Sequence, residues 1–428
     1  MQKERNHFMK SVAIIGLGYV GLPLAKLFVK NGFHVTGIDI DKAKIRELKR
    51  RKSYITDLSD LEIEALWSTG SFEATDKYER VSEAGACIIC VPTPLKNNQV
   101  PELRYLQAAV KSISPFVQKG QLIVLESSTF PGTTEEVVQP MLEAGGRKAG
   151  TDFFLGYSPE RIDPGNQQYQ LEDIPKVISG VTGKCSDELD GLYSRVFTKT
   201  IRVSSPKVAE MTKVFENTQR FINISFMNEI AMVCHEMDID IWEVIEAAAT
   251  KPFGFVHYAP GPGIGGHCIP VDPLYLSWKA KQYEATTNFI ELSKNINDQM
   301  PFYVIERLEK LLAAEGKALE QAAVLLIGLT YKKDVNDIRD SSAVIIFNAL
   351  KERGTAVYFH DPLFMKYETK AGTVESAELS AEFIKKQDCV VILTNHTDVP
   401  YDLLLKHAPL IFDTRNQLKA KHSQVKYL

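Results

Sequence analysis

A glycine-rich turn between a predicted strand and a predicted helix is the feature that most constrains the fold. The apolar run Ser11–Ile15 is followed by the sequence GLGYVG at 16–21 and then by apolar residues at helical spacing. Such glycines permit a tight turn and the close approach of a pyrophosphate, whose charge is stabilised by the N-terminus of the helix. The pattern predicts a dinucleotide-binding sheet at the start of the chain. The alternative is a glycine-rich turn in another kind of α/β domain.

An acidic residue at the end of the second predicted strand favours NAD as the dinucleotide. This strand spans 34–38, and Asp39 follows it where a carboxylate can accept hydrogen bonds from the adenosine ribose and would repel the 2′-phosphate of NADP. The basic run at 42–52 is interpreted mainly as a solvated helix face, with Lys44 as a candidate contact near the adenine. The residues predicted to bind NAD here are Gly16, Gly18, Tyr19, Val20, Gly21, Asp39 and Lys44.

Composition and charge indicate a soluble protein of two or three domains. The chain has 428 residues, of which 44% are hydrophobic and 24% are charged, so long disordered stretches are not expected. The formal net charge of -4 gives no field that would attract nucleic acid. The first ten residues are polar and basic, and the apolar run behind them is broken by glycines, so neither a signal peptide nor a membrane span is predicted.

The six cysteines are scattered along the chain and predict neither a disulfide framework nor a metal site. Their low density fits a reducing, cytoplasmic environment. Cys87 and Cys90 match the spacing C-x-x-C, but they lie in an apolar strand and no second pair completes a zinc site. We therefore expect these two cysteines in the core and predict no bound metal.

Apolar strands that alternate with helices from 11 to about 205 predict a doubly wound parallel sheet. In such sheets ligands bind beyond the carboxyl ends of the strands. Polar residues follow three predicted strands at these ends, namely Thr93, the segment 126–129 with Thr129, and the segment 158–161 with Glu160 and Arg161. Each could be a cap or a turn residue, but their recurrence at successive strand ends favours a shared cleft.

A long helix is predicted from 206 to about 237, where apolar residues recur at helical spacing. Glu210, Lys213 and Asn217 lie three and four positions apart on it and share one face. The alternative is an exposed polar stripe. The helix is apolar around its circumference, which predicts a homodimer formed through this central segment.

A glycine-dense loop at 261–272 carries a candidate nucleophile. Its sequence, GPGIGGHCIPVD, places Cys268 among glycines that let a ligand approach the backbone, with Asp272 four positions later. A surface connection with a chance cysteine is the alternative. The pattern predicts a binding surface with a reactive thiol.

A second alternation of strands and helices begins near 322. The glycine fingerprint is replaced there by the segment 330–342, which contains Lys332 and Arg339. We expect a nucleotide-binding type of sheet that binds a different phosphate ligand through basic side chains. The predicted α/β fold has two Rossmann-like doubly wound sheets joined by a central long-helix domain. Its parts are a flexible terminus at 1–10, an NAD-binding domain at 11–205, a central domain at 206–312 and a second Rossmann-like domain at 313–428.

Over essentially the whole chain beyond residue 10, this order of motifs resembles the UDP-glucose/GDP-mannose dehydrogenase family. The resemblance rests on the glycine turn with Asp39, VPTP at 91–94, ST and PGT within 128–133, E-x-x-K-x-x-x-N at 210–217, GGHC at 265–268 with Asp272, and Lys332 with DIR at 337–339. The segments SPER at 158–161 and KPFGF at 251–255, with His267, are similar to the branch that oxidises UDP-N-acetylhexosamines. The resemblance implies a cytoplasmic homodimer that uses NAD and a UDP-sugar in polysaccharide biosynthesis, with the UDP-sugar bound by 313–428.

The resemblance also implies a four-electron oxidation of a sugar C6 alcohol to a carboxylate with two NAD. Cys268 would hold the aldehyde as a thiohemiacetal and then as a thioester. Lys213 and Asn217 would stabilise oxyanions. The implied catalytic residues are Cys268, Lys213, Asn217, Asp272, Thr129 and Glu160. The implied substrate-binding residues are Glu160, Arg161, Lys213, Asn217, Phe255, Gly265 and Lys332, and Thr93, Thr129 and Arg339 would contact the cofactor.

Three alternatives stay open at this point. A UDP-glucose 6-dehydrogenase would differ only in its sugar. A dehydrogenase that stops after one hydride transfer would not need Cys268, and a non-enzymatic NAD-binding protein would not need the set Lys213, Asn217, Cys268 and Asp272. The presence of the complete set favours the four-electron enzyme.

Overall fold

The fold divides into two compact units. A computed structural model describes residues 10–55, 57–96, 100–161, 169–419 and 422–428. The N-terminal unit comprises Met1–Glu216 with Leu274–Ala285, and the C-terminal unit comprises Asn217–Pro273 with Thr286–Leu428. The helix α8, Pro206–Glu236, contributes residues to both units. The three-domain division, with boundaries near 205 and 312, stays a prediction.

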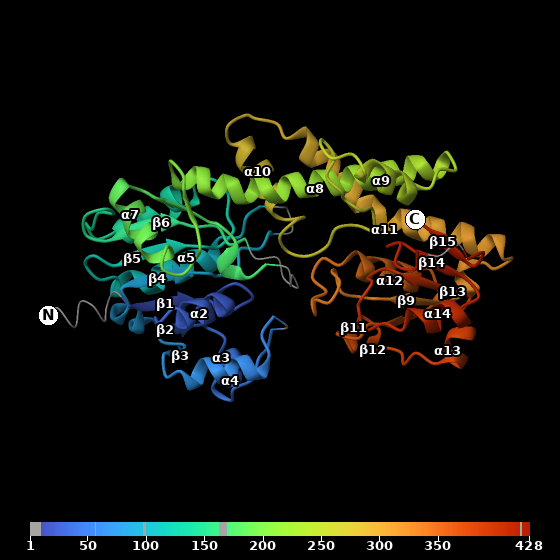
Figure 1. Ribbon diagram of the computed structural model, residues 1–428, viewed down its shortest axis with the longest axis horizontal. Coiled ribbons are helices and arrows are strands. Elements are labelled where there is room, and N and C mark those ends of the chain that lie inside the picture. The colour runs from blue at the N-terminus through green and yellow to red at the C-terminus, as the bar shows by residue number, and fades with distance from the viewer. Residues whose placement is uncertain (1–9, 56, 97–99, 162–168, 420–421) are drawn as a thin grey trace. The chain divides into compact units, whose positions relative to one another are not determined.

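The N-terminal unit is built on a sheet of eight described strands in the order β3-β2-β1-β4-β5-β6-β7-β8 (Figure 1). Neighbouring strands pair in parallel except β6 and β7, which are antiparallel. The sequence predicted a wholly parallel sheet, so the reversal of β7 is a correction; an antiparallel pair needs no crossover helix. The strands are β1 Ser11–Ile15, β2 His34–Ile38, β3 Phe72–Thr75, β4 Ala86–Ile89, β5 Leu122–Leu125, β6 Phe154–Tyr157, β7 Lys176–Gly180 and β8 Thr200–Arg202.

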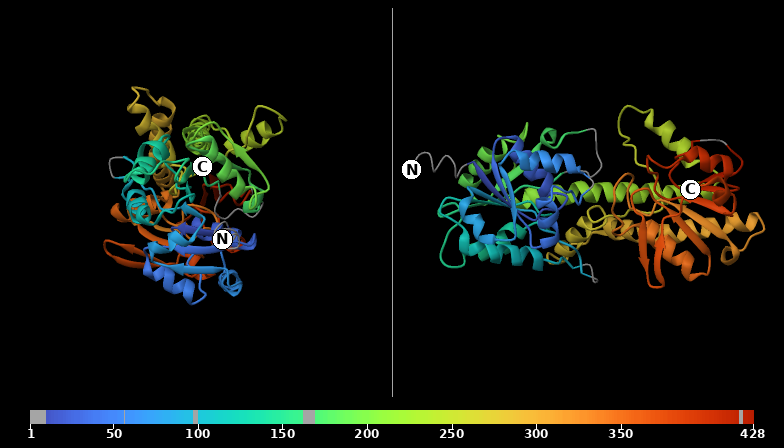
Figure 2. Two further views of the ribbon diagram at one scale, coloured as in Figure 1. Left: turned by 90° about the vertical axis from the view of Figure 1, so that its left-hand side faces the viewer. Right: turned by 90° about the horizontal axis from the view of Figure 1, so that it is seen from below.

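Helices cover both faces of this sheet (Figure 1, Figure 2). Alternate residues of β1 enter two cores: Val12 and Ile14 belong to the core with α2, α3, α4 and α7, whereas Ala13 and Ile15 belong to the core with α5 and α6. A strand buried on both faces is a continuous apolar run, which is why β1 is recognisable in the sequence. The helices are α2 Gly21–Lys30, α3 Lys42–Lys49, α4 Asp60–Ser68, α5 Arg104–Ile113, α6 Gln139–Glu143 and α7 Gly183–Tyr193.

The C-terminal unit contains a parallel sheet in the order β10-β9-β13-β14-β15 and a separate antiparallel hairpin of β11 and β12 (Figure 1). Both faces of this sheet are covered as well, because Val324 and Leu326 pack with α11 and α12 while Leu325 and Ile327 pack with α13 and α14. The strands are β9 Ala323–Ile327, β10 Ala356–His360, β11 Lys366–Thr369, β12 Gly372–Glu375, β13 Cys389–Ile392, β14 Ile411–Asp413 and β15 Val425–Tyr427. The helices are α9 Ile241–Ala249, α11 Asn288–Ala314, α12 Ser342–Glu352, α13 Ala381–Lys385 and α14 Tyr401–His407.

The long helix predicted from 206 is observed as α8, and the chain from 272 to 314 is divided into two further helices. It forms α10, Asp272–Lys281, and α11, because Glu284 between them has a φ of 56°, a left-handed conformation that ends a helix. None of the helices in the described part of the chain combines the length and apolar character needed to cross a membrane. Short 3-10 helices span Tyr78–Glu83, Ser114–Phe116, Leu171–Asp173 and Leu319–Gln321, and a short π-helix spans Thr134–Val138.

The same turn follows the first strand of each sheet. In the N-terminal unit, Gly16 has a φ of 93°, and the next backbone N–H donates to Asp39 Oδ2 at 2.9 Å. In the C-terminal unit, Gly328 has a φ of 83°, and the next N–H donates to Asp361 Oδ2 at 2.8 Å. Positive φ favours glycine. The second sheet therefore keeps the first glycine of the turn, although it lacks the rest of the fingerprint.

A buried carboxylate anchors α8 to the turn after β5. Glu210 is fully buried and accepts hydrogen bonds from the backbone N–H of Gly132 and from the N–H and hydroxyl of Thr134, the last two at 2.8 and 2.7 Å. Burial raises the pKa of Glu210 to about 7 in spite of these donors. The carboxylate therefore ties two elements that are far apart in the sequence.

Replacing Glu210 with glutamine should destabilise the N-terminal unit. The glutamine NH₂ group would face backbone or hydroxyl donors, and one unsatisfied buried donor costs about 1–3 kcal/mol. Thermal unfolding followed by circular dichroism should therefore show a lower midpoint. The control is Glu236→Gln, an exposed change on the same helix, which should leave the midpoint in place. Equal midpoints for both variants would contradict the anchoring role.

Candidate active site

The glycine turn after β1 has the backbone shape and the open space that a dinucleotide needs. A Cβ on Gly16 would lie 2.7 Å from the carbonyl oxygen of the residue after β4, and a Cβ on Gly21 would lie 1.9 Å from the Gly16 carbonyl oxygen. No heavy atom of another described residue, apart from its chain neighbours, lies within 4 Å of the Cβ position of Gly18, so the turn stays open there. Tyr19 and Val20 directly precede α2, whose N-terminus points a positive dipole end at this space. These residues fit the pyrophosphate of NAD.

Asp39 lies beside the same turn at the end of β2. Its Oδ2 accepts the N–H of Leu17 at 2.9 Å and lies 3.2 Å from Lys44 Nζ, and its Oδ1 accepts the N–H of Asp41 at 2.9 Å. The side chain is only 6% exposed. The carboxylate is therefore held in one orientation, and its remaining lone pairs can accept hydroxyl groups of a ribose.

Thr93, Thr129 and Glu160 follow three neighbouring strands. Since β4, β5 and β6 pair in parallel, the residues after them lie at one carboxyl edge of the sheet. The Thr93 hydroxyl donates to the carbonyl of Ser128 at 2.5 Å and links two of these strand ends. Thr129 is 1% exposed, and its hydroxyl has no hydrogen-bond partner within the described residues. Such a buried hydroxyl is available to a bound water or ligand.

A buried group of charges lies at the same edge. Lys176 Nζ is 2.9 Å from Glu126 Oε2 and 3.0 Å from Glu160 Oε2, and Tyr193 donates its hydroxyl to Glu126. Because β7 runs antiparallel to β6, its first residue, Lys176, lies where β6 ends. Lys176 was not among the site residues predicted from the sequence, because it begins an apolar strand. The available signal was a lysine at the start of a run that is otherwise apolar.

Arg161 is bound within the N-terminal unit. Its Nη2 lies 2.6 Å from Glu216 Oε1, its Nε donates to Oε2 of the same residue at 3.3 Å, and its Nη1 donates to the carbonyl of Pro175 at 2.9 Å. These contacts use most of the guanidinium donors. The predicted contact of Arg161 with substrate stays a prediction.

Lys213 and Asn217 lie one turn apart on α8. Lys213 is 9% exposed. Asn217 is 3% exposed, and its Nδ2 donates to Asp272 Oδ2 at 2.6 Å. The structure therefore brings together two of the predicted catalytic residues, Asn217 and Asp272.

Buried asparagines hold the loop that carries Cys268. Asn228 on α8 accepts the N–H of Gly261 at 2.8 Å. Asn297 on α11 accepts the N–H of Ile264 at 2.7 Å and donates to the carbonyl of the same residue at 3.2 Å. Neither asparagine could be predicted as a loop contact from the sequence, because their partners are 33 positions away. Cys268 itself is partly buried, just before α10.

The segment after β9 packs against this loop. Gly266 donates its N–H to the carbonyl of Arg339 at 3.0 Å, and a Cβ on Gly265 would lie 2.7 Å from the carbonyl oxygen of Asp340. The Arg339 guanidinium is held by Asp337, with Nη2 at 2.6 Å from Oδ2. Arg339, predicted to contact the cofactor, is thus a neighbour of the cysteine loop.

Two further predicted residues, Lys332 and Phe255, are partly buried in the C-terminal unit. One further residue near the loop, Arg415, was not predicted from the sequence. Its Nε donates to the carbonyl of Leu393 at 2.8 Å, and its Nη1 lies 2.5 Å from the Cβ position of Gly261. Gly261 is therefore required for this close approach of the guanidinium to the loop.

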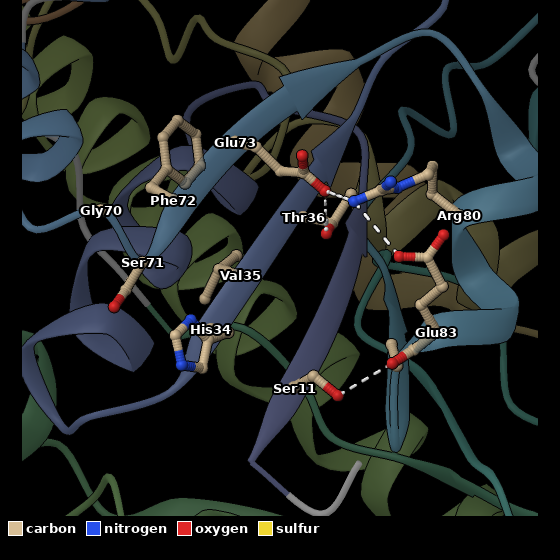
Figure 3. A pocket seen from close by; sticks show the side chains of 11 residues that line it. Ser11, His34, Val35, Thr36, Gly70, Ser71, Phe72, Glu73, Arg80 and Glu83 are labelled. Carbon is tan, nitrogen blue, oxygen red and sulfur yellow. Dashed lines mark hydrogen bonds and ion pairs between the residues drawn. The ribbon is translucent and has the colours of Figure 1, made fainter. Parts of the chain in front are cut away.

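A cavity of about 310 Å³ lies elsewhere, beside the residues that begin β1, β2 and β3 (Figure 3). Figure 3 shows Arg80 between the carboxylates of Glu73 and Glu83, and its Nη2 is 3.2 Å from Glu83 Oε2. These carboxylates neutralise the charge of Arg80 at the cavity wall. Ligands of parallel sheets bind at the opposite, carboxyl edge, so this cavity is not the candidate active site.

Comparison with known proteins identifies the family. Sequence models of the UDP-glucose/GDP-mannose dehydrogenase family match its NAD binding domain to residues 10–197, its central domain to 207–299 and its UDP binding domain to 325–420. The chain is 36% identical over 427 residues to protein CapL of Staphylococcus aureus, covering 97% of this chain and 98% of CapL. It is 39% identical over 355 residues to a UDP-N-acetyl-D-glucosamine 6-dehydrogenase of Pseudomonas aeruginosa, covering 82% of each. The solved structure of a UDP-D-ManNAc dehydrogenase from Pyrococcus horikoshii matches with a TM-score of 0.88 at 29% identity, covering 97% of this chain and 98% of the other.

These matches extend along the whole chain and are not confined to the first sheet. They confirm the predicted α/β fold, the NAD cofactor and the nucleotide-sugar dehydrogenase class. The chain therefore belongs to the UDP-glucose/GDP-mannose dehydrogenase family of NAD-dependent oxidoreductases.

Proposed function

We propose that this enzyme oxidises the C6 hydroxyl of a UDP-N-acetylhexosamine to a carboxylate. The observation that carries the proposal is the partly exposed Cys268 on the glycine-rich loop. The backbone carbonyl of Cys268 accepts the N–H of Asp272 at 2.9 Å, which fixes the position of the cysteine. A dehydrogenase that removes two electrons needs no nucleophile, whereas one that removes four must hold the aldehyde between its two oxidations. A thiol on a rigid loop meets that need.

The proposed reaction consists of two oxidations and one hydrolysis. Bound NAD supplies a hydride acceptor for each oxidation, so two are used per sugar. The Cys268 thiolate adds to the aldehyde carbon to form a thiohemiacetal, and loss of a hydride from that carbon leaves a thioester. Water then attacks the thioester carbonyl, the C–S bond breaks, and the thiol is regenerated with release of the acid.

Some of the proposed catalytic residues stabilise negative charge, and others position water or transfer a proton. Lys213 and Asn217 donate to the oxyanions that develop at the sugar carbon, since a positively charged ammonium and an amide held by Asp272 are suited to that role. Asp272 orients the Asn217 amide and the attacking water. Thr129, with its unpaired buried hydroxyl, holds this water, and Glu160 takes a proton from it.

The proposed binding residues fall into two sets, one for NAD and one for the UDP-sugar. NAD is held by the glycine turn and by strand-end residues, and the UDP-sugar by residues of the strand ends, of α8 and of the C-terminal unit. The proposed NAD contacts are Gly16, Gly18, Tyr19, Val20, Gly21, Asp39, Lys44, Thr93, Thr129 and Arg339. The proposed substrate contacts are Glu160, Arg161, Lys213, Asn217, Phe255, Gly265 and Lys332.

An N-acetylated sugar is proposed from the motifs and the relatives. The relatives include a UDP-N-acetyl-D-glucosamine 6-dehydrogenase and a UDP-D-ManNAc dehydrogenase. A pocket built for a 2-acetamido group leaves its polar groups unpaired when a sugar carries a bare 2-hydroxyl. UDP-GlcNAc or an epimer of it is therefore the proposed substrate, with UDP-glucose as the alternative.

An apolar stripe on α8 supports a homodimer. Val208, Phe215, Phe226 and Val233 are 43%, 60%, 53% and 46% exposed, and their spacings of seven, eleven and seven residues place them on one side of the helix. A stripe of this kind is covered in solution by an apolar surface. We propose that a second copy of the chain covers it, and that the enzyme acts in the cytoplasm in polysaccharide biosynthesis.

Cys268→Ser should abolish sustained turnover and leave the binding of NAD and UDP-sugar in place. A serine hydroxyl neither ionises readily nor leaves as a stabilised anion, so acid formation should fall by more than a hundredfold, about 3 kcal/mol or more. Steady-state acid formation and calorimetric binding measure the two properties. Cys234→Ser, at a buried position outside the loop, is the control. Acid formation by Cys268→Ser near the parent rate would rule out the covalent route.

UDP-N-acetylhexosamines should give the highest kcat/KM in a panel of nucleotide sugars. The panel comprises UDP-glucose, UDP-galactose, UDP-GlcNAc, UDP-GalNAc, UDP-ManNAc and GDP-mannose, and NADH formation is the readout. A tenfold preference corresponds to about 1.4 kcal/mol of transition-state discrimination. A tenfold preference for UDP-glucose would remove the proposed sugar and leave the dehydrogenase class intact.

A further inference from the structure

Four buried side chains form a cluster at the carboxyl edge of the first sheet. We call Glu126, Glu160, Lys176 and Tyr193 the carboxylate cluster. Lys176 Nζ donates to both carboxylates, at 2.9 Å to Glu126 and 3.0 Å to Glu160, and the Tyr193 hydroxyl donates to the other oxygen of Glu126. The Lys176 side chain is 3% exposed, and its Nζ lies 5.5 Å from the Tyr193 ring centre. The ammonium is thus shielded from water and shared by two acids.

The charges in this cluster do not balance when both acids are ionised. Two carboxylates and one ammonium leave a net negative charge in a buried place, which is costly. Burial raises the pKa of Glu126 to about 7; the charge of Glu160 adds to that effect, and Lys176 opposes it. Burial alone would lower the pKa of Lys176, but the two carboxylates raise it above its ordinary value. The cluster is therefore arranged to take up one proton near neutral pH while Lys176 stays charged.

The two carboxylates differ in access to solvent. The Glu126 side chain is 0% exposed and both of its oxygens accept hydrogen bonds, whereas the Glu160 side chain is 7% exposed. Glu160 Oε2 is held by Lys176, and Oε1 accepts the N–H of Arg161 at 2.7 Å. Glu160 is therefore the more accessible of the two carboxylates, and Glu126 acts on it through the shared ammonium.

We propose that Lys176 and Glu126 are positioning residues that fix the orientation and set the protonation of Glu160 for hydrolysis of the thioester. This inference rests on the proposed function. In the step, the water oxygen bonds to the thioester carbon, the C–S bond breaks, Glu160 takes one proton from the water, and the Cys268 sulfur leaves as a thiolate. No electrons are gained or lost overall. The proton cancels the surplus negative charge of the cluster.

The two residues act on Glu160 in opposite directions. Lys176 favours the ionised base by Coulomb attraction, and Glu126 disfavours it by repulsion. The hydrolysis rate should fall at low pH as Glu160 becomes protonated, and we call this fall the acid limb of the pH profile. Removing Lys176 should move the acid limb to higher pH, and removing the charge of Glu126 should move it to lower pH. Within the described residues, other titratable or charged groups near the cluster include Cys87, Cys90, Arg161 and Glu216, and none of them is changed in the test.

The test follows the decay of the Cys268 acyl-enzyme across pH. The full-length enzyme is mixed with UDP-GlcNAc and NAD, quenched at intervals, and the Cys268 adduct is measured by intact-protein mass spectrometry. In Lys176→Met the adduct should persist at least tenfold longer than in the parent at neutral pH, and the acid limb should rise by about one pH unit. In Glu126→Gln the limb should fall by about the same amount, and Lys176→Arg should restore most of the parent rate.

A matched control separates positioning from a loss of structure. Lys279 is also buried, at 7% exposure, and its Nζ lies 2.6 Å from Glu136 in the same unit. Lys279→Met should change neither the decay of the adduct nor its pH profile. If Lys176→Met does not fold, Glu126→Gln and Lys176→Arg decide the outcome. A pH profile that stays in place in Glu126→Gln, or that moves in the same direction in both charge-removing variants, would overturn the inference.

The parent enzyme tests the proposed function separately. If the parent forms acid through a Cys268 adduct and the variants do not shift its decay, only the positioning roles fail. If the parent forms no adduct with any nucleotide sugar of the panel, the proposed function fails and the inference fails with it.

Discussion

In each of the two sheets, one carboxylate at the end of the second strand holds the turn that follows the first strand. Asp39 and Asp361 accept the backbone N–H that comes directly after Gly16 and Gly328. This hydrogen bond fixes a turn with positive φ, so the backbone rather than a side chain faces the ligand space. In the first sheet a helix begins directly after the turn, which suits a pyrophosphate; in the second sheet the segment 330–342, which contains Lys332 and Arg339, takes its place.

Much of this arrangement could be predicted from the sequence, because its signals are local. The strand, glycine turn and helix at 11–30 are neighbours in the chain, and α8 is a continuous helical pattern. The reversal of β7 could not be predicted, since pairing direction depends on a partner strand and leaves no local pattern. The partnership of Lys176 with Glu126 was missed for the same reason, as these residues lie 50 positions apart.

The candidate catalytic groups depend on buried polar contacts more than on charge at the surface. Asn297 holds the cysteine loop through both of its amide atoms, and Asn217 donates to Asp272. Buried hydrogen bonds of this kind keep a catalytic geometry fixed, because breaking one leaves an unsatisfied polar group. Cys268 was recognisable from its glycine-rich context, whereas the asparagines that hold its loop are recognisable only from the fold.

The ratio of NADH to acid tests the central claim, a four-electron oxidation that does not release its aldehyde. The measurement combines NADH absorbance with quantification of the uronic acid and of any aldehyde captured by an added hydroxylamine. The account predicts two NADH for each acid formed, with no aldehyde oxime in solution during turnover. One NADH per sugar, with the aldehyde oxime as the main product, would contradict it.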